Sequence, residues 1–271
     1  MAFATSLPEL FVGISSAIAK TPNLSLGNVI GSNIVDLTLI FGIVIVYSRN
    51  IQIKPLAVKK DVVKMFLVCI APIALFLIGN KLSRIDGAIL IGVFSLYAYN
   101  LIKSRKKYTK KIENNIKRYD VILNTFIFIF SLVLLFLSSK YVVQYANAIA
   151  IDLVIPLIIV GLFIVAIGTS LPELVFELSS ASKGHSEFAL GDVIGSVVVN
   201  STLVLGVTSL IYPIEANFLY FLTSAIFMIL VAFIFLTFIY SGNKLDFKEG
   251  ISLIFLYVFF LILEFFLKIG L

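Results

Sequence analysis

The sequence is poor in the residues from which soluble redox and metal proteins are built. Its 271 residues include one cysteine and one histidine, and only 13% of them are charged. The single cysteine, Cys69, excludes a disulfide within the chain and a thiolate metal site. In contrast, 60% of the residues are hydrophobic and the mean hydropathy is +1.10, well above an ordinary soluble domain. The chain is therefore predicted to be an integral membrane protein.

Apolar runs long enough to cross a membrane recur along the whole sequence. They predict nine helices, at residues 1–19, 24–47, 62–79, 85–102, 121–145, 153–181, 188–212, 218–240 and 247–266. The expected fold class is an all-α polytopic bundle, which crosses the cell membrane many times and is surrounded by lipid.

Basic residues gather on alternate connections between these helices. Residues 103–118, KSRKKYTKKIENNIKR, hold eight basic residues and one acidic residue. The connections expected on that side of the membrane hold 15 basic residues in total, and those on the opposite side hold five. Since cytoplasmic loops are enriched in Lys and Arg, this side is predicted to be cytoplasmic. The net charge of +6 then reports orientation, and no nucleic-acid partner is expected.

The sequence also contains an internal repeat. Residues 2–42 align on residues 166–206 without a gap, and nearly half of the pairs are identical. We refer to this offset, which takes Ala2 to Ala166, as the repeat shift. Under it, ATSLPEL at Ala4 returns as GTSLPEL at Gly168, and GNVIGSNIVD at Gly27 returns as GDVIGSVVVN at Gly191. The apolar composition that the two segments share does not explain the matches of Pro, Glu, Gly and Ser.

The repeated helices lie an odd number of spans apart, so they cross the membrane in opposite directions. The sequence thus predicts an inverted-topology repeat of five-helix units, an arrangement found in many secondary transporters. The first repeat covers residues 1–107, a basic cytoplasmic loop covers 108–118, and the second repeat covers 119–271. Because the helix at 121–145 has no counterpart in the first repeat, we expect that repeat to lack its first helix.

Prolines and carboxylates meet inside the repeated motifs. Pro8 and Pro172 each remove a helical hydrogen bond, and each is followed at once by a glutamate, Glu9 or Glu173. An ionised side chain at membrane depth is costly without a partner, which marks both glutamates as functional candidates. Glu177 follows Glu173 by one helical turn, but Gly13 is its repeat partner, so it is either a vestibule acid or structural.

Other oxygen-bearing side chains share the faces of these helices. They are Thr5, Ser6, Ser32, Asp36, Thr169, Ser170, Ser196 and Asn200. Oxygen ligands without Cys or His favour a hard cation, and we expect Ca²⁺ or Na⁺ rather than zinc. The motif glycines permit either close helix packing or a local break.

These motifs resemble the alpha-1 and alpha-2 repeats of the Ca²⁺/cation antiporter superfamily, and most closely those of prokaryotic sodium/calcium exchangers. The resemblance implies that Glu9 and Glu173 clamp Ca²⁺ together with Thr5 and Thr169. It further implies Na⁺ sites formed with both glutamates by Ser6, Ser32, Ser170, Ser196 and the backbone carbonyls of Ala2 and Ala166. Asp36 and Asn200 match the central site, with the family's acid and amide exchanged between the two repeats.

The resemblance implies antiport of Na⁺ against Ca²⁺ by alternating access, without enzymatic activity or a cofactor, in a protein that functions as a monomer. Three Na⁺ would neutralise the three carboxylates, and protonation of Asp36 would complete neutralisation by one Ca²⁺. Alternatives are a Ca²⁺/H⁺ or K⁺-linked antiporter of the same superfamily, and a cation channel. An intramembrane hydrolase is disfavoured because neither Ser6 nor Ser170 has a plausible base.

Overall fold

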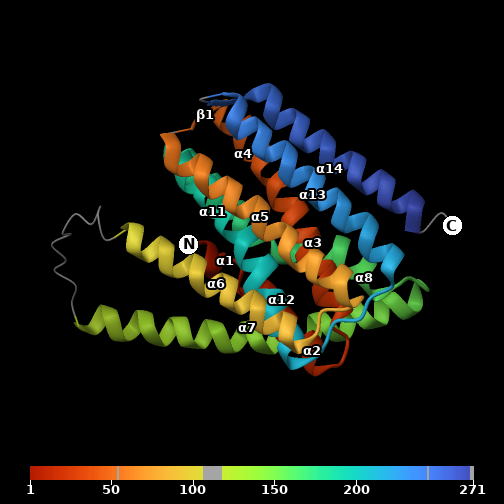
Figure 1. Cartoon of the computed structure of the whole chain (residues 1–271). Helices are drawn as coiled ribbons and strands as arrows, with labels where there is room; N and C mark the ends of the chain where they lie inside the picture. The colour runs from red at the N-terminus through yellow and green to blue at the C-terminus, as the bar shows by residue number, and fades with distance from the viewer. Residues whose placement is uncertain (54, 106–117, 243, 269–271) are drawn as a thin grey trace.

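A computed structural model describes residues 1–53, 55–105, 118–242 and 244–268, and these are mostly helical (Figure 1). The helices are α1 (Ala2–Thr5), α2 (Leu7–Ile18), α3 (Asn23–Val35), α4 (Phe41–Ser48), α5 (Pro55–Gly79), α6 (Arg84–Arg105), α7 (Arg118–Asp152), α8 (Leu157–Val160), α9 (Ala166–Thr169), α10 (Leu171–Ser182), α11 (Ser186–Val199), α12 (Leu205–Ile211), α13 (Phe218–Ser241) and α14 (Phe247–Lys268). Three π-helical segments are η1 (Asp36–Ile40), η2 (Gly161–Val165) and η3 (Asn200–Val204), and two short strands are β1 (Asn50–Gln52) and β2 (Lys244–Asp246).

The predicted membrane bundle is confirmed. In the described part of the chain, eight helical stretches are long and apolar enough to span a membrane: Asn23–Ser48, Val58–Gly79, Arg84–Lys103, Leu123–Asp152, Leu157–Ser182, Ser186–Ile211, Phe218–Ser241 and Phe247–Leu267. The first predicted helix corresponds to α1 and α2. Of these, α2 (Leu7–Ile18) is an apolar helix, but it is shorter than the eight spans. The largest boundary difference is in α7, which extends beyond the predicted 121–145 at both ends.

The repeated prolines begin helices instead of lying within them. Pro8 and Pro172 sit in the first turns of α2 and α10, and the chain leaves helical geometry just before, at Ser6 and Ser170, whose ψ angles are 9° and 3°. Proline has no N–H to donate to the preceding turn, so a break at this point costs no further hydrogen bond. Each of the two motif spans is therefore two helices joined at a serine.

The helices α3 and α11, which carry most of the motifs GNVIGSNIVD and GDVIGSVVVN, form the centre of the bundle. All residues of α3 from Leu24 to Val35 are buried, and ten of the fourteen residues of α11 are buried as well. In contrast, α7 exposes apolar side chains such as Phe126, Phe128 and Phe130, as expected for a helix in contact with lipid. Figure 1 shows α7 and α14 along opposite edges of the molecule.

Backbone pairing at the two ends of the bundle obeys the repeat shift. In the β1–β2 ribbon Asn50 pairs with Asp246, and an isolated antiparallel bridge joins Leu82 to Ile214. The shift takes Asn50 to Ile214 and Leu82 to Asp246, so the two pairings are equivalent. The ribbon lies at one end of the helices and the α12–α13 connection lies at the other (Figure 1). The repeat is therefore inverted, as predicted.

Each inverted half also packs one of its helices against the other half, and we call these the exchanged helices. α4 packs on α14 and α6 packs on α12, which are the same contact made twice under the repeat. Gly42 faces the carbonyl of Gly250 in the first contact, and Gly206 faces the carbonyl of Gly87 in the second. Each half thus covers the other, and the bundle is one folded body.

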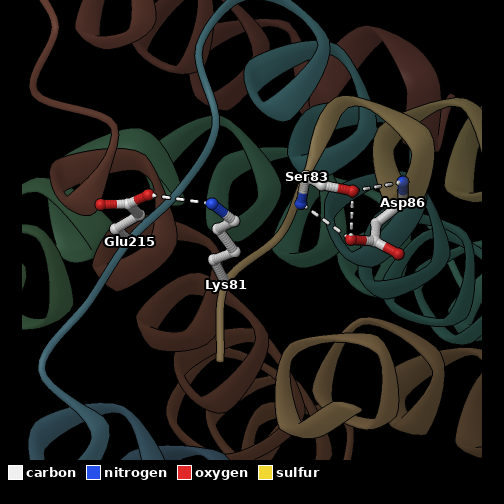
Figure 2. A network of polar contacts seen from close by, with 4 residues as sticks. All are labelled: Lys81, Ser83, Asp86 and Glu215. Carbon is white, nitrogen blue, oxygen red and sulfur yellow. Dashed lines mark hydrogen bonds and ion pairs between the residues drawn. The ribbon is translucent and has the colours of Figure 1, made fainter. Parts of the chain in front are cut away.

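The turn before α6 ties the halves together at the end opposite the ribbon (Figure 2). Asp86 accepts hydrogen bonds from the backbone N–H and hydroxyl of Ser83, at 2.8 and 2.7 Å. Ser83 accepts in return from the N–H of Asp86 at 3.3 Å, which completes a capping box. Nearby, the ammonium of Lys81 lies 3.4 Å from a carboxylate oxygen of Glu215, on the α12–α13 connection.

Candidate cation site

Three predicted carboxylates meet in the centre of the bundle. Glu9 in the first turn of α2, Glu173 in the first turn of α10, and Asp36 at the start of η1 are each 0% exposed. The charge of Glu9 interacts with those of Glu173 and Asp36. The break before each proline and the π-helical turn at Asp36 lie directly beside these three groups in the chain.

Two threonines contact side chains of the other repeat, and we refer to these as the crossed contacts. The hydroxyl of Thr169 lies 3.4 Å from that of Ser32 and donates to the side-chain oxygen of Asn28 at 3.0 Å. Thr5 makes the equivalent contacts, 3.4 Å from the hydroxyl of Ser196 and 3.4 Å from a carboxylate oxygen of Asp192. Each residue pair in one set becomes a pair in the other under the repeat shift. The predicted site is thus built with an internal twofold relationship.

The predicted sodium-binding serines are all fully buried. Ser32 donates to Glu9 at 3.4 Å, whereas the hydroxyls of Ser6 and Ser170 have no hydrogen-bond partner among the described residues. The carbonyls of Ala2 and Ala166 each accept two hydrogen bonds, one from the N–H four residues on and one from the threonine hydroxyl three residues on. Ser6 and Ser170 therefore offer free oxygens, whereas the carbonyls of Ala2 and Ala166 are engaged within their own helices.

Buried oxygens without hydrogen-bond partners in the described chain accumulate around this centre. They belong to Ser6, Glu9, Asp36, Ser170, Glu173, Glu177, Asp192 and Asn200. A buried acceptor left unpaired costs about 1–3 kcal/mol, and more when it is charged. This number of partnerless oxygens in one place indicates that they are arranged to coordinate cations, and not to form hydrogen bonds with one another. In the described residues no three His, Cys, Asp or Glu side chains form a metal-binding group by themselves, so hydroxyl, amide or carbonyl oxygens would complete any coordination.

Sequence reasoning missed two features of the site. Asp36 and Asn200 each begin a π-helical segment, which widens the turn at the residue that faces the centre. π-Helical turns concentrate at functional sites, yet no motif in the sequence marked them. The second feature is Asp192, which belongs to the crossed contacts through Thr5. Its match to Asn28 in the repeat was the only available signal.

The motif glycines bring helix backbones together on one side only. A side chain at Gly27 or Gly31 would collide with the carbonyl of Ile158 or Leu162, so α3 rests directly on α8 and η2. Of the equivalent pair, Gly195 faces only the side chain of Ala2, and Gly191 faces open space. In the first repeat these glycines therefore serve close packing.

A cavity of about 1250 Å³ reaches the site from the side of α7. It is lined mainly by apolar side chains and contacts both prolines, Pro8 and Pro172, and Thr169 of the crossed contacts. Tyr141 and Tyr145 of α7 are among its lining residues. Thr169 thus lies at the edge of an open space.

The sequence matches the sodium/calcium exchanger protein family over residues 1–103 and 123–266, which is most of the chain. The sodium/calcium exchanger MaX1 of Methanosarcina acetivorans is 28% identical over 313 residues, covering 98% of this chain and 87% of that protein. An uncharacterized membrane protein of Methanocaldococcus jannaschii is 32% identical over 218 residues, covering 80% of this chain and 70% of that one.

Solved structures agree with this match. The sodium-calcium exchanger NCX_Mj, soaked with 2.5 mM Na⁺ and 1 mM Sr²⁺, superimposes with a TM-score of 0.71 at 26% identity, covering 96% of this chain and 83% of that chain. The H⁺/Ca²⁺ exchanger CAX superimposes with a TM-score of 0.70 at 16% identity, over 94% and 70% of the two chains, which shows a shared fold. The chain therefore belongs to the sodium/calcium exchanger protein family.

Proposed function

We propose that this protein exchanges Na⁺ for Ca²⁺ across a membrane by alternating access. The crossed contacts of Thr5 and Thr169 carry the proposal, because they join two inverted repeats around buried carboxylates. A centre that belongs equally to both halves can face either side of the membrane when the halves tilt. The relatives named above as sodium/calcium exchangers support the choice of ions.

The central ion in this proposal is Ca²⁺ between Glu9 and Glu173, with Thr5 and Thr169 beside it. Ca²⁺ takes six to eight oxygens, and the partnerless carboxylate oxygens of the glutamates are suited to that role. Na⁺ would use the same glutamates with Ser6, Ser32, Ser170 and Ser196, and the chain near Ala2 and Ala166. Asp36 and Asn200 stand beside the central position, one from each repeat.

Charge then couples the two ions. Within the described residues Glu9, Asp36 and Glu173 are buried without cationic partners, so an empty centre would carry three costly negative charges through the membrane. Three Na⁺ neutralise them, while one Ca²⁺ with a proton on Asp36 does the same. The empty protein therefore does not change between its inward-open and outward-open forms. As a result, Na⁺ and Ca²⁺ are exchanged for each other, and neither crosses the membrane uncoupled.

The proposed orientation follows from the basic connections. The β1–β2 ribbon carries Lys244 and follows Arg49, and the predicted cytoplasmic loop follows α6. Most of that loop, residues 108–118, lies outside the described residues. We place this end in the cytoplasm, with the repeats at 1–107 and 119–271 and the functional unit a single chain.

Ion uptake into sealed vesicles tests the proposal. Purified protein is reconstituted, and ⁴⁵Ca²⁺ uptake is measured with an outward gradient of Na⁺, of K⁺ or of protons in turn. We expect uptake with the Na⁺ gradient alone. Uptake driven by protons or K⁺ would reassign the counter-ion within the superfamily, and uptake without any counter-ion gradient would indicate a channel.

A further inference from the structure

Glu177 is a buried acid to which the ion sites described above give no role. It lies on α10, four residues after Glu173 and therefore about 6 Å further along the same helix face. It is 0% exposed, and neither of its carboxylate oxygens has a hydrogen-bond partner in the described part of the chain. A carboxylate in this condition is strongly destabilising unless a cation or a proton accompanies it.

The repeat explains why no group of the described chain accompanies Glu177. Its partner in the first repeat is Gly13, where an added side chain would meet Thr208, Ser25 and Val204. Under the repeat shift those three neighbours become the apolar residues Val44, Ala189 and Ile40, all of them buried. The first repeat thus has hydroxyls and no acid at this place, and the second has an acid and no hydroxyls.

The charges that act on Glu177 are negative. Its carboxylate interacts first with Asp36, then with Asp192 and Glu173. This agrees with the packing, because α10 contacts η1, which begins at Asp36, as well as α4 and α11. Both carboxylate oxygens of Asp36 also lack a hydrogen-bond partner among the described residues. Two carboxylates without hydrogen-bond partners therefore lie on elements that pack against each other, Glu177 on α10 and Asp36 on η1.

We propose that Glu177 and Asp36 together bind one further Na⁺, in addition to the ions held around Glu9 and Glu173. The residues that replace the hydroxyls of the first repeat are apolar and supply no further side-chain oxygens for the larger coordination shell of Ca²⁺, which favours a monovalent ion at this position. The added carboxylate raises by one the number of Na⁺ needed to neutralise the Na⁺-filled site, and in the Ca²⁺-bound form Glu177 takes up a proton, as Asp36 does, so that both filled forms are neutral. The proposal rests on Na⁺/Ca²⁺ exchange as the protein's function.

The coupling ratio tests this position. In vesicles held at zero membrane potential, the Na⁺ gradient that just balances a fixed Ca²⁺ gradient gives the number of Na⁺ exchanged per Ca²⁺. Glu177→Gln should lower this number by one, while Glu177→Asp and the control Glu264→Gln, which alters a buried glutamate on α14, should leave it unchanged. An unchanged ratio in Glu177→Gln overturns the inference and marks Glu177 as a neutral carboxylic acid.

Direct binding covers the case in which Glu177→Gln does not transport. Saturation of the detergent-purified protein with ²²Na⁺ should show one fewer ion per chain in Glu177→Gln than in the wild type, and an equal number overturns the inference. Failure of the proposed function looks different, because the wild type itself would then show no Na⁺-driven Ca²⁺ uptake.

Discussion

The two repeats share their backbone plan but differ in where they place charge. The paired strands and the crossed threonine contacts obey the same repeat shift, and the exchanged helices follow it to within one residue. Three buried positions at the site do not match in charge: Gly13 against Glu177, Asn28 against Asp192, and Asp36 against Asn200. On the proposed mechanism, the symmetric features serve the movement that both halves share, and the asymmetric features set the number of ions that are bound.

The largest expected effect comes from a symmetric pair. Glu9→Gln and Glu173→Gln should each lower Na⁺-driven Ca²⁺ uptake by on the order of 100-fold or more, because loss of one buried charge partner costs about 3–5 kcal/mol. Uptake by reconstituted vesicles measures both, with Glu264→Gln as the control. Wild-type uptake by either variant would refute the site, and a large difference between the two would refute its symmetry.

A smaller and more selective effect is expected at the asymmetric pair. Asp36→Asn removes a charge that Ca²⁺ does not need if Asp36 is protonated when Ca²⁺ is bound. Ca²⁺/Ca²⁺ exchange should therefore stay within about threefold of the wild type, while the Na⁺ concentration for half-maximal Ca²⁺ release rises about tenfold, equivalent to about 1.4 kcal/mol.

Exchange of the two groups provides the matched comparison. The double variant Asp36→Asn/Asn200→Asp restores the charge count on the other repeat, and it should recover most of the Na⁺ dependence. Abolished Ca²⁺/Ca²⁺ exchange in Asp36→Asn would contradict the protonated form. A double variant no better than the single one would show that position, and not charge count, governs Na⁺ binding.

The sequence predicted the parts of this protein that depend on composition and on the repeat. Long apolar runs gave the helices, and the repeat shift gave both the inverted plan and the meeting of Glu9 with Glu173. The structure then added equivalences that residue identities do not carry, such as Asn50–Asp246 with Leu82–Ile214. Those pairings lie where the letters of the two repeats no longer match.

Local backbone geometry escaped prediction for a physical reason. The π-helical turn at Asp36 inserts one residue into a helix whose hydrophobic pattern is otherwise continuous, so periodicity carries no trace of it. Likewise, Glu177 was ambiguous because its burial depends on the packing of α10 against α4 and η1, which belong to the other repeat. Side-chain identity showed where charge is, whereas packing showed which charges are left without partners.

Helix packing offers a stability comparison between equivalent glycines. Gly27→Ala would press a methyl group against the carbonyl of Ile158, whereas Gly191→Ala enters open space. We expect Gly27→Ala to destabilise the protein by about 1–3 kcal/mol through overpacking, and Gly191→Ala to be neutral or stabilising by up to about 1 kcal/mol through helix propensity. Thermal unfolding in detergent measures both. Equal effects would mean that α3 and α11 are packed alike.

The smallest expected effects lie at the turn before α6, where the halves are joined outside the core. Ser83→Ala removes the capping contacts with Asp86 and should cost about 1 kcal/mol. Lys81→Ala removes only an exposed ion pair with Glu215, and should cost no more than about 0.5 kcal/mol. Thermal unfolding at low and high salt separates them, because salt screens the exposed ion pair more than it weakens the short hydrogen bonds of the cap. A larger loss from Lys81→Ala than from Ser83→Ala would show that the link between the halves, rather than the start of α6, stabilises this end of the bundle.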